Sequence, residues 1–402
     1  MVNFFLNNKH FKLKNISFFF GIVVLSLTIY LPSLKNGFLN WDDNWYITDN
    51  PYISDFSFSG IINMFTHLYH IQYSPLVMVV LSFLKYTFGL NPIPFHLTSL
   101  IFHIINIWLI FRFIDLLTGK TDLALFVATF FAVHTLQVES VAWMSAIKVV
   151  ISTSFFLLSL IYYVRFNTTE RKRNYYLSLL FFILALLSKE QTLILPLVIV
   201  TIDYFHDRKL LSRKVILEKI PYVFLSALFL TIAMIATYTQ GFNSKMPAVN
   251  ILYQIEIVFY SMFNYLSKFI LPVNLSSFYP YPAFINYYML IIPLLLTFII
   301  LFALIKKLIT RKELIFAIGF FFINIFLTLQ ILPVRKIFMA DRYMYLPLIG
   351  ILLIIGFILN RLIKLNPKYK LHIISIVSVF IVFFTILSFS RTKVWNSSLS
   401  LW

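Results

Sequence analysis

Long runs of apolar residues, separated by short charged segments, dominate this chain. A helix needs about 20 apolar residues to cross the hydrocarbon core of a bilayer. By this measure the sequence predicts eleven membrane-spanning helices, at residues 16–34, 95–114, 122–140, 144–164, 174–188, 190–205, 219–238, 287–305, 313–332, 343–360 and 371–390. The expected fold is therefore an all-α polytopic membrane protein, with one transmembrane domain over residues 1–402.

Two further apolar segments carry too many polar side chains to be predicted as spans. They are residues 251–271, with Glu256 and Lys268, and residues 73–88, with Lys85. We expect both to form amphipathic helices that lie in the outer membrane interface. The second belongs to residues 35–93, the longest segment between predicted spans, which is too long and too rich in aromatic and acidic residues for a bare connector.

The basic residues predict the orientation of the chain in the membrane. Lysines precede the first apolar run, which lacks a small-residue cleavage site and therefore resembles a signal anchor. With the N-terminus in the cytoplasm, four later clusters also fall inside: Arg171, Lys172 and Arg173; Arg208, Lys209, Arg213 and Lys214; Lys306, Lys307, Arg311 and Lys312; Arg361, Lys364, Lys368 and Lys370. This agreement follows the positive-inside rule and predicts a non-cytoplasmic C-terminus.

Composition supports a membrane protein and argues against a soluble domain and against a nucleic-acid-binding protein. Hydrophobic residues make up 60% and charged residues 12% of the chain, whereas about a quarter of a soluble domain is charged. The net charge of +18 is distributed as the positive-inside rule expects, so we reject nucleic acid as a partner. The absence of cysteine excludes disulfides and thiolate metal sites.

The remaining ionisable residues gather on the predicted outer side. They include Asp42, Asp43, His134, Glu139, Lys148, Lys189, Glu190, Asp341 and Arg342. Polar residues near membrane depth are costly and are candidates for function. Acids and bases on one face are typical of a site that binds an anionic headgroup and supplies a base.

Each of these residues also has a structural interpretation. Asp42 and Asp43 could supply a general base, or hold a divalent cation such as Mg²⁺ or Mn²⁺, or cap a helix. Lys189, Arg342 and Lys148 suit a phosphate group. Alternatively, Lys189 and Glu190 form a neutralised interfacial pair, and Arg342 reaches to the lipid headgroups.

Three histidines have the same two interpretations. His134 and Gln137, three residues apart on a predicted helix, could line a sugar or phosphate pocket together with Glu139, or form interhelical hydrogen bonds. His96 and His103 share one face of the predicted 95–114 helix with Ser99 and Asn106. For this second set a polar seam between helices is the favoured interpretation, and a pocket the alternative.

Taken in order, several motifs resemble those of a known family. They are Phe38-Leu39-Asn40-Trp41-Asp42-Asp43 with Tyr46 and Asn50-Pro51; Tyr73-Ser74-Pro75-Leu76; Phe95-His96-Leu97-Thr98 with His103 and Asn106; His134 to Trp143; Ser188-Lys189-Glu190; Asn274-Leu275 with Tyr279-Pro280; and Ala340 to Pro347. This order resembles the membrane part of the transmembrane-and-tetratricopeptide-repeat glycosyltransferases, relatives of the protein O-mannosyltransferases in the GT-C superfamily. No tetratricopeptide repeat is expected within the chain.

The resemblance implies a GT-C-like helical bundle and a hexosyltransferase that uses a polyprenyl-phosphate sugar donor, mannose-like in type. It implies a catalytic acid at Asp42 or Asp43, with Asp42 favoured, and a protein or glycan acceptor. The chain departs from the family pattern at Ser74 and at Ile147 and Val149, where relatives carry more polar residues. A lipid-linked sugar flippase or transporter, and a non-catalytic membrane binding or assembly protein, are the alternatives.

Overall fold

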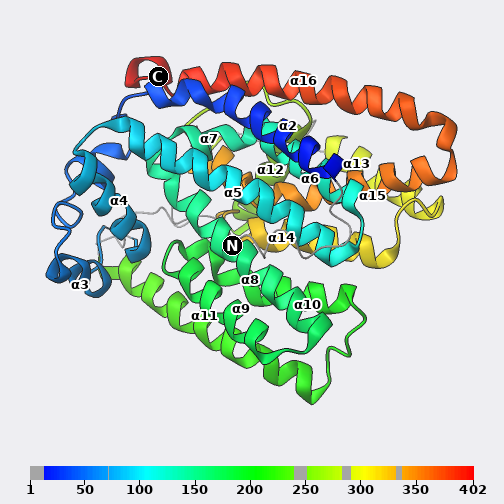
Figure 1. The fold of residues 1–402 in the computed structure, drawn as a ribbon, viewed down its shortest axis with the longest axis horizontal. Helices are drawn as coiled ribbons and strands as arrows, with labels where there is room; N and C mark the ends of the chain where they lie inside the picture. Colours follow the sequence, from blue (N-terminus) through cyan, green and yellow to red (C-terminus); the bar gives the residue numbers. More distant parts are fainter. Residues whose placement is uncertain (1–12, 71, 240–250, 283–290, 332–336) are drawn as a thin grey trace.

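Long helices that run roughly along one direction form most of the molecule (Figure 1). The computed structural model describes residues 13–70, 72–239, 251–282, 291–331 and 337–402. In Figure 1, α16 (Lys370–Val394) and α11 (Arg213–Thr239) lie along opposite edges, with the other long helices between them. The predicted all-α class is confirmed, and its long apolar helices indicate a membrane-embedded protein.

The number of predicted spans is not confirmed. Within the described ranges, six helices are long and apolar enough to cross a bilayer. They are Ser17–Lys35, which contains most of α2 (Leu13–Tyr30); α5 (Pro92–Thr118); Met144–Thr169, which contains α8 (Ile147–Thr169); Arg213–Ala236 in α11; α15 (Leu348–Leu365); and Pro367–Val394, which contains α16. The other five predicted spans are occupied by one bent pair of helices and by four shorter helices.

A bend at His134 corrects the prediction of one straight helix over residues 122–140. The helix α6 (Thr121–Val133) ends there, and a short turn leads into α7 (Val138–Ala142) at an angle of 61°. The His134 side chain accepts a hydrogen bond from the backbone N–H of Leu136 at 3.2 Å, which caps the new turn. The two segments together would make a seventh crossing.

Four other predicted spans are occupied by shorter helices. These are α9 (Lys172–Leu186), α10 (Leu195–Phe205), α13 (Ile291–Ile305) and α14 (Arg311–Phe326). At 1.5 Å per residue they are about 16 to 24 Å long, less than the ~30 Å of a hydrocarbon core. The first residues of the predicted 287–305 span lie outside the described part of the chain.

The segments predicted as interfacial helices are helical. α4 (Pro75–Phe88) covers the predicted segment 73–88 and follows α3 (Phe58–Thr66), and α12 (Ile251–Ile270) covers the predicted segment 251–271. Their position in the interface remains a prediction. A pair of short antiparallel strands, β1 (Tyr279–Pro280) and β2 (Ile337–Met339), was not predicted, because the paired residues lie almost 60 positions apart.

Contacts between side chains show which helix ends lie together at each of the two ends of the molecule. At one end, Lys312 at the start of α14 pairs with Asp207 after α10, and Lys120 before α6 pairs with Glu313 at 2.5 Å. These pairs bring predicted cytoplasmic clusters together. The other end holds α3, α4 and the C-terminal helix α17 (Ser398–Leu401), which lie towards the left of Figure 1. The candidate residues lie at this second end.

Candidate functional site

The twin aspartates have different environments. Asp43 is fully buried and accepts hydrogen bonds from the backbone N–H of Leu39 at 2.9 Å and from the backbone and hydroxyl of Ser145 at 3.0 and 2.5 Å. Burial raises the pKa of Asp43 to about 6, although these hydrogen bonds oppose the rise. Asp43 therefore anchors its loop to the start of the 144–169 helix.

Asp42 is the more accessible of the two. Its backbone has a φ of +63°, a left-handed conformation that is uncommon outside glycine. Its carboxylate is half-buried and accepts a hydrogen bond from the indole Nε1 of Trp45 at 2.9 Å. Seven described residues other than glycine have a positive φ, so accessibility and not backbone conformation distinguishes Asp42 from Asp43.

The two aspartates do not fit a shared metal ion. Both oxygens of Asp43 already accept hydrogen bonds from protein donors, and Asp42 accepts one from an indole. Among the described residues, no group of three or more histidine, aspartate or glutamate side chains has a metal-binding arrangement.

A buried ion pair lies beside this loop. Glu139 on α7 pairs with the guanidinium of Arg342 and accepts its backbone N–H at 2.8 Å. The guanidinium lies 5.0 Å from the ring centroids of both Trp143 and Tyr343. Burial lowers the pKa of Arg342, but the charge of Glu139, and more weakly that of Asp42, raises it overall. Arg342 therefore remains a cation within the field of Asp42.

Trp143 connects the ion pair to the aspartate loop. Its indole Nε1 donates a hydrogen bond to the backbone oxygen of Trp41 at 3.0 Å. Two positions later, Ser145 binds Asp43. Through Trp143 and Ser145, the short segment after α7 therefore contacts the loop that carries both aspartates, and local sequence patterns alone do not predict this contact.

Asp341, which precedes Arg342 in the chain, is a second buried carboxylate of this region. One of its carboxylate oxygens accepts a hydrogen bond from the hydroxyl of Tyr279 at 2.8 Å, and the other is buried without a hydrogen-bond partner among the described residues. Burial, followed by the charge of Glu139, raises the pKa of Asp341, whereas Arg391 and Lys268 lower it. The β1–β2 pair brings Tyr279 to this position.

Lys189 and Arg342 line one small cavity. It lies between α8, the turn after α9 and the segment that precedes α15, and its volume is about 40 Å³. The Lys189 side chain is only 4% exposed. This space holds one or two water molecules, so a sugar phosphate binds only if the surrounding side chains move.

Lys148 and Glu190 lie around Tyr46. The ammonium of Lys148 is 4.6 Å from the Tyr46 ring and donates a hydrogen bond to Gln72 at 2.6 Å. The hydroxyls of Tyr46 and Ser74 are 3.0 Å apart, and burial, with a smaller contribution from the charge of Glu190, raises the pKa of Tyr46. Ser74, a departure from the family pattern, therefore takes part in the polar contacts of this region.

Of the two histidines on α5, His103 has a side-chain partner, whereas neither ring nitrogen of His96 has a hydrogen-bond partner among the described residues. His103 and Asn106 both contact the hydroxyl of Tyr345, at 2.8 and 3.2 Å, and Asn106 also bonds to α8. This arrangement is the polar seam between helices. His96 is buried beside the backbone of Asn36.

His134 does not line the cavity around Lys189. Its Nε2 lies 3.0 Å from the backbone oxygen of Phe269, and its ring stacks between Phe269 and Phe384. Its Nδ1 caps the turn after α6. Both ring nitrogens are therefore used in holding the fold.

An apolar groove approaches the site from the helices. Its volume is about 320 Å³, and it runs between α6, α15 and α16 to the end of α12. Phe269 and Phe384 line the end of this groove that lies towards the site. Lys268 adjoins Phe269, and Arg391 follows Phe384 by seven residues, about 10 Å along α16. The sequence analysis did not assign Lys268 or Arg391 to the site. Both lie at helix ends close to aromatic residues, and this pattern could have identified them as candidates.

Comparisons with known proteins do not assign the chain to a family. No protein-family model matches the sequence, and no curated protein matches it.

Proposed function

We propose that this protein is an integral membrane glycosyltransferase. It would move a hexose from a polyprenyl-phosphate carrier to an acceptor hydroxyl of a protein or glycan, at the non-cytoplasmic face and with inversion at the sugar. The observation that supports this most directly is that the charge of Asp42 acts on the buried cation Arg342, which lines one small cavity with the buried Lys189. Such a transfer needs a base and a phosphate-binding group together.

Asp42 is the proposed base. A carboxylate can accept the proton of an attacking hydroxyl only if that hydroxyl can reach it. Asp42 is half-buried, whereas Asp43 is enclosed and hydrogen-bonded on both oxygens. Asp43 is then a positioning residue, which holds the backbone that presents Asp42.

Arg342 and Lys189 are proposed to bind the donor phosphate. Glu139 and the two flanking aromatic rings hold the Arg342 guanidinium in place. A fixed cation in a site of low dielectric stabilises developing negative charge without reorganising first. Lys148, which lies over Tyr46, is the more distant phosphate candidate.

The groove between α6, α15 and α16 is proposed to hold part of the polyprenyl chain. The twelve side chains that line it are apolar, and they extend from Ile373 to Phe384 on α16, about 16 Å of helix. Lys268 and Arg391 stand beyond its end next to Asp341. A lipid with an apolar tail and an anionic head matches this order of groups.

In the proposed reaction the acceptor oxygen attacks the anomeric carbon as its proton passes to Asp42. The bond between that carbon and the phosphate oxygen breaks at the same time. Polyprenyl phosphate leaves with the bonding electrons, and the cations stabilise its added charge. A single displacement of this kind inverts the anomeric configuration.

A transfer assay tests the proposal. The purified protein is reconstituted with radiolabelled polyprenyl-phosphate hexose and candidate acceptors. The wild type should form labelled product, and Asp42→Asn should reduce the rate by about 10² or more, the range for loss of a general base. Asp49→Asn is the matched control, because Asp49 is exposed on the same loop and its carboxylate accepts a hydrogen bond from its neighbour Thr48.

The same preparation separates the alternatives. Movement of the labelled lipid across a sealed vesicle without transfer would indicate a flippase. Binding of the lipid without either would indicate a binding or assembly protein. Unchanged transfer by Asp42→Asn would remove this residue from the mechanism.

A further inference from the structure

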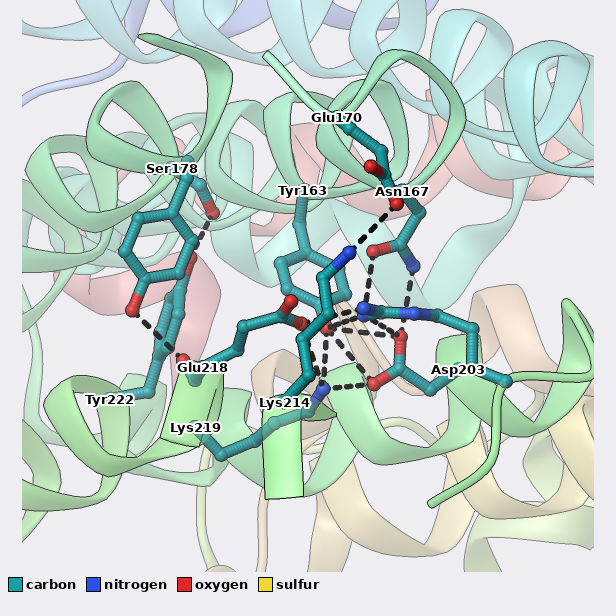
Figure 2. Close-up of polar contacts among 11 residues, drawn as sticks. Tyr163, Asn167, Glu170, Ser178, Asp203, Lys214, Glu218, Lys219 and Tyr222 are labelled. Atoms are coloured by element: carbon teal, nitrogen blue, oxygen red, sulfur yellow. Dashed lines mark hydrogen bonds and ion pairs between the residues drawn. The ribbon is translucent and has the colours of Figure 1, made fainter. Parts of the chain in front are cut away.

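A second polar cluster lies at the opposite end of the helices from the candidate site. Figure 2 shows Asp203 of α10 surrounded by Tyr163 of α8 and Lys219 of α11. Asp203 is fully buried, and both of its oxygens lie 2.9 Å from the Tyr163 hydroxyl. Lys219 pairs with the same carboxylate. The cluster therefore ties three helices together at one point.

The charges of this cluster balance within it. Arg208 contacts Asp203 at 3.1 Å and Glu218 at 2.7 Å, so two acids face two bases. Asn167 adds a hydrogen bond to Asp203 at 2.9 Å. These groups satisfy one another, which fixes the start of α11 and the position of Lys219.

An apolar groove adjoins Lys219 on the outer surface of this assembly. Its volume is about 450 Å³, within the ~300–1,000 Å³ range of small-ligand sites. Its walls come from α10, α11 and the segment between them: Val200, Leu210, Val215, Ile216, Lys219, Ile220, Val223 and Phe224. Several of these side chains are exposed, as expected where a helix faces lipid.

Two exposed cations lie close in sequence to the residues that line the groove. Arg213, the first residue of α11, precedes Ile216 by three positions and Ile220 by seven, so the three share one helix face. Lys209 lies next to Leu210, which lines the groove. Both cations are exposed. An apolar channel is thus followed by two positive charges along the helix axis.

We propose that this groove binds one anionic phospholipid, with an acyl chain against α11 and its phosphate at Lys209 and Arg213. A zwitterionic lipid would fill the apolar part but lacks the net charge that two cations favour. Free phosphate has no group for the apolar walls. The basic end of the molecule is the predicted cytoplasmic side, where anionic lipids attract basic residues. The inference does not depend on glycosyl transfer.

Native mass spectrometry of the full chain in detergent tests this site. Phosphatidylglycerol is titrated against phosphatidylcholine, and glycerol phosphate serves as the headgroup without a tail. One phosphatidylglycerol should bind with clear preference. Lys209→Gln combined with Arg213→Gln should weaken that binding roughly tenfold, given the attraction of each basic residue to an anionic headgroup.

Two further variants keep the test sharp. Lys172→Gln with Arg173→Gln removes two exposed charges at the same end but outside the groove, and should leave binding within about twofold of wild type. Ile220→Trp fills the groove without altering charge and should also weaken binding. The proposal is overturned if phosphatidylcholine binds equally, if the control pair weakens binding as much as the groove pair, or if glycerol phosphate alone binds as tightly.

Discussion

At the scale of single residues, buried charge sets the behaviour of the candidate site. Burial disfavours the ionised form of Asp43, and three hydrogen bonds hold its carboxylate in place. Arg342 is a cation enclosed with its partner, Glu139. The sequence predicted these residues as candidates, and the family resemblance favoured Asp42 over Asp43. The anchoring of Asp43 was not predicted, because it depends on Ser145, more than 100 residues later.

Asp43 should make stability depend on pH. Its pKa is about 6 in the folded protein against 3.8 without burial, so the folded state holds the proton more tightly. Protonation of Asp43 therefore adds up to about 3 kcal/mol to the free energy of unfolding, as calculated from the shift in pKa. This stabilisation is complete below pH 4 and is lost as the pH rises towards 6. The thermal midpoint in detergent should therefore fall over this range, and less so in Asp43→Asn. Equal slopes for both proteins would contradict the assignment.

Replacing only one partner of the Glu139–Arg342 pair should destabilise the folded protein. Glu139→Gln leaves a buried guanidinium without its counter-charge, and such changes cost about 3–5 kcal/mol. Replacing both residues, as Glu139→Gln with Arg342→Met, should recover part of this loss because no buried charge remains. Thermal unfolding of the two variants measures the difference. A double variant less stable than the single one would argue against the pair as described.

At the scale of helices and strands, apolar runs predicted the long helices and missed the interruptions. Helices α5 and α16 follow their apolar runs closely. The break at His134 depends on a side chain that caps the next turn and on Phe269, a contact from another part of the chain. The β1–β2 pair is equally non-local. Hydrophobic periodicity carries no information on such contacts.

Close approach between α14 and α15 should depend on Gly350. A β-carbon at this position would lie 2.6 Å from the backbone oxygen of Ala317 and 2.7 Å from the β-carbon of Phe321. Gly350→Ala should therefore separate the helices and cost about 1–3 kcal/mol, as overpacking does. Gly21→Ala, where nothing lies within 4 Å, is the matched control. Equal thermal midpoints for the two variants would contradict this packing.

At the scale of the whole molecule, the polar groups divide between two ends. The candidate site lies at one end, and the basic clusters with the Asp203 network lie at the other. Sequence reasoning predicted this division from charge alone, because lysines and arginines follow the positive-inside rule. It did not predict which polar residues touch, since helix packing decides that.

The two ends should face opposite sides of the membrane. The natural chain has no cysteine, so single introduced cysteines report without background. In intact cells, Asp49→Cys should react with an impermeant maleimide from outside, and Lys368→Cys should react only after the membrane is opened. Both positions are exposed. Labelling of both from the same side would contradict the predicted orientation.

The most direct measurement of the central claim is a cryo-EM structure with a non-hydrolysable polyprenyl-phosphonate hexose bound. We expect the phosphonate within hydrogen-bonding distance of Arg342 and Lys189, with Asp42 facing the anomeric carbon from the side of the acceptor. We also expect prenyl density in the groove between α6, α15 and α16. A phosphonate bound at the opposite end of the helices, or an anomeric carbon out of reach of Asp42, would contradict this claim.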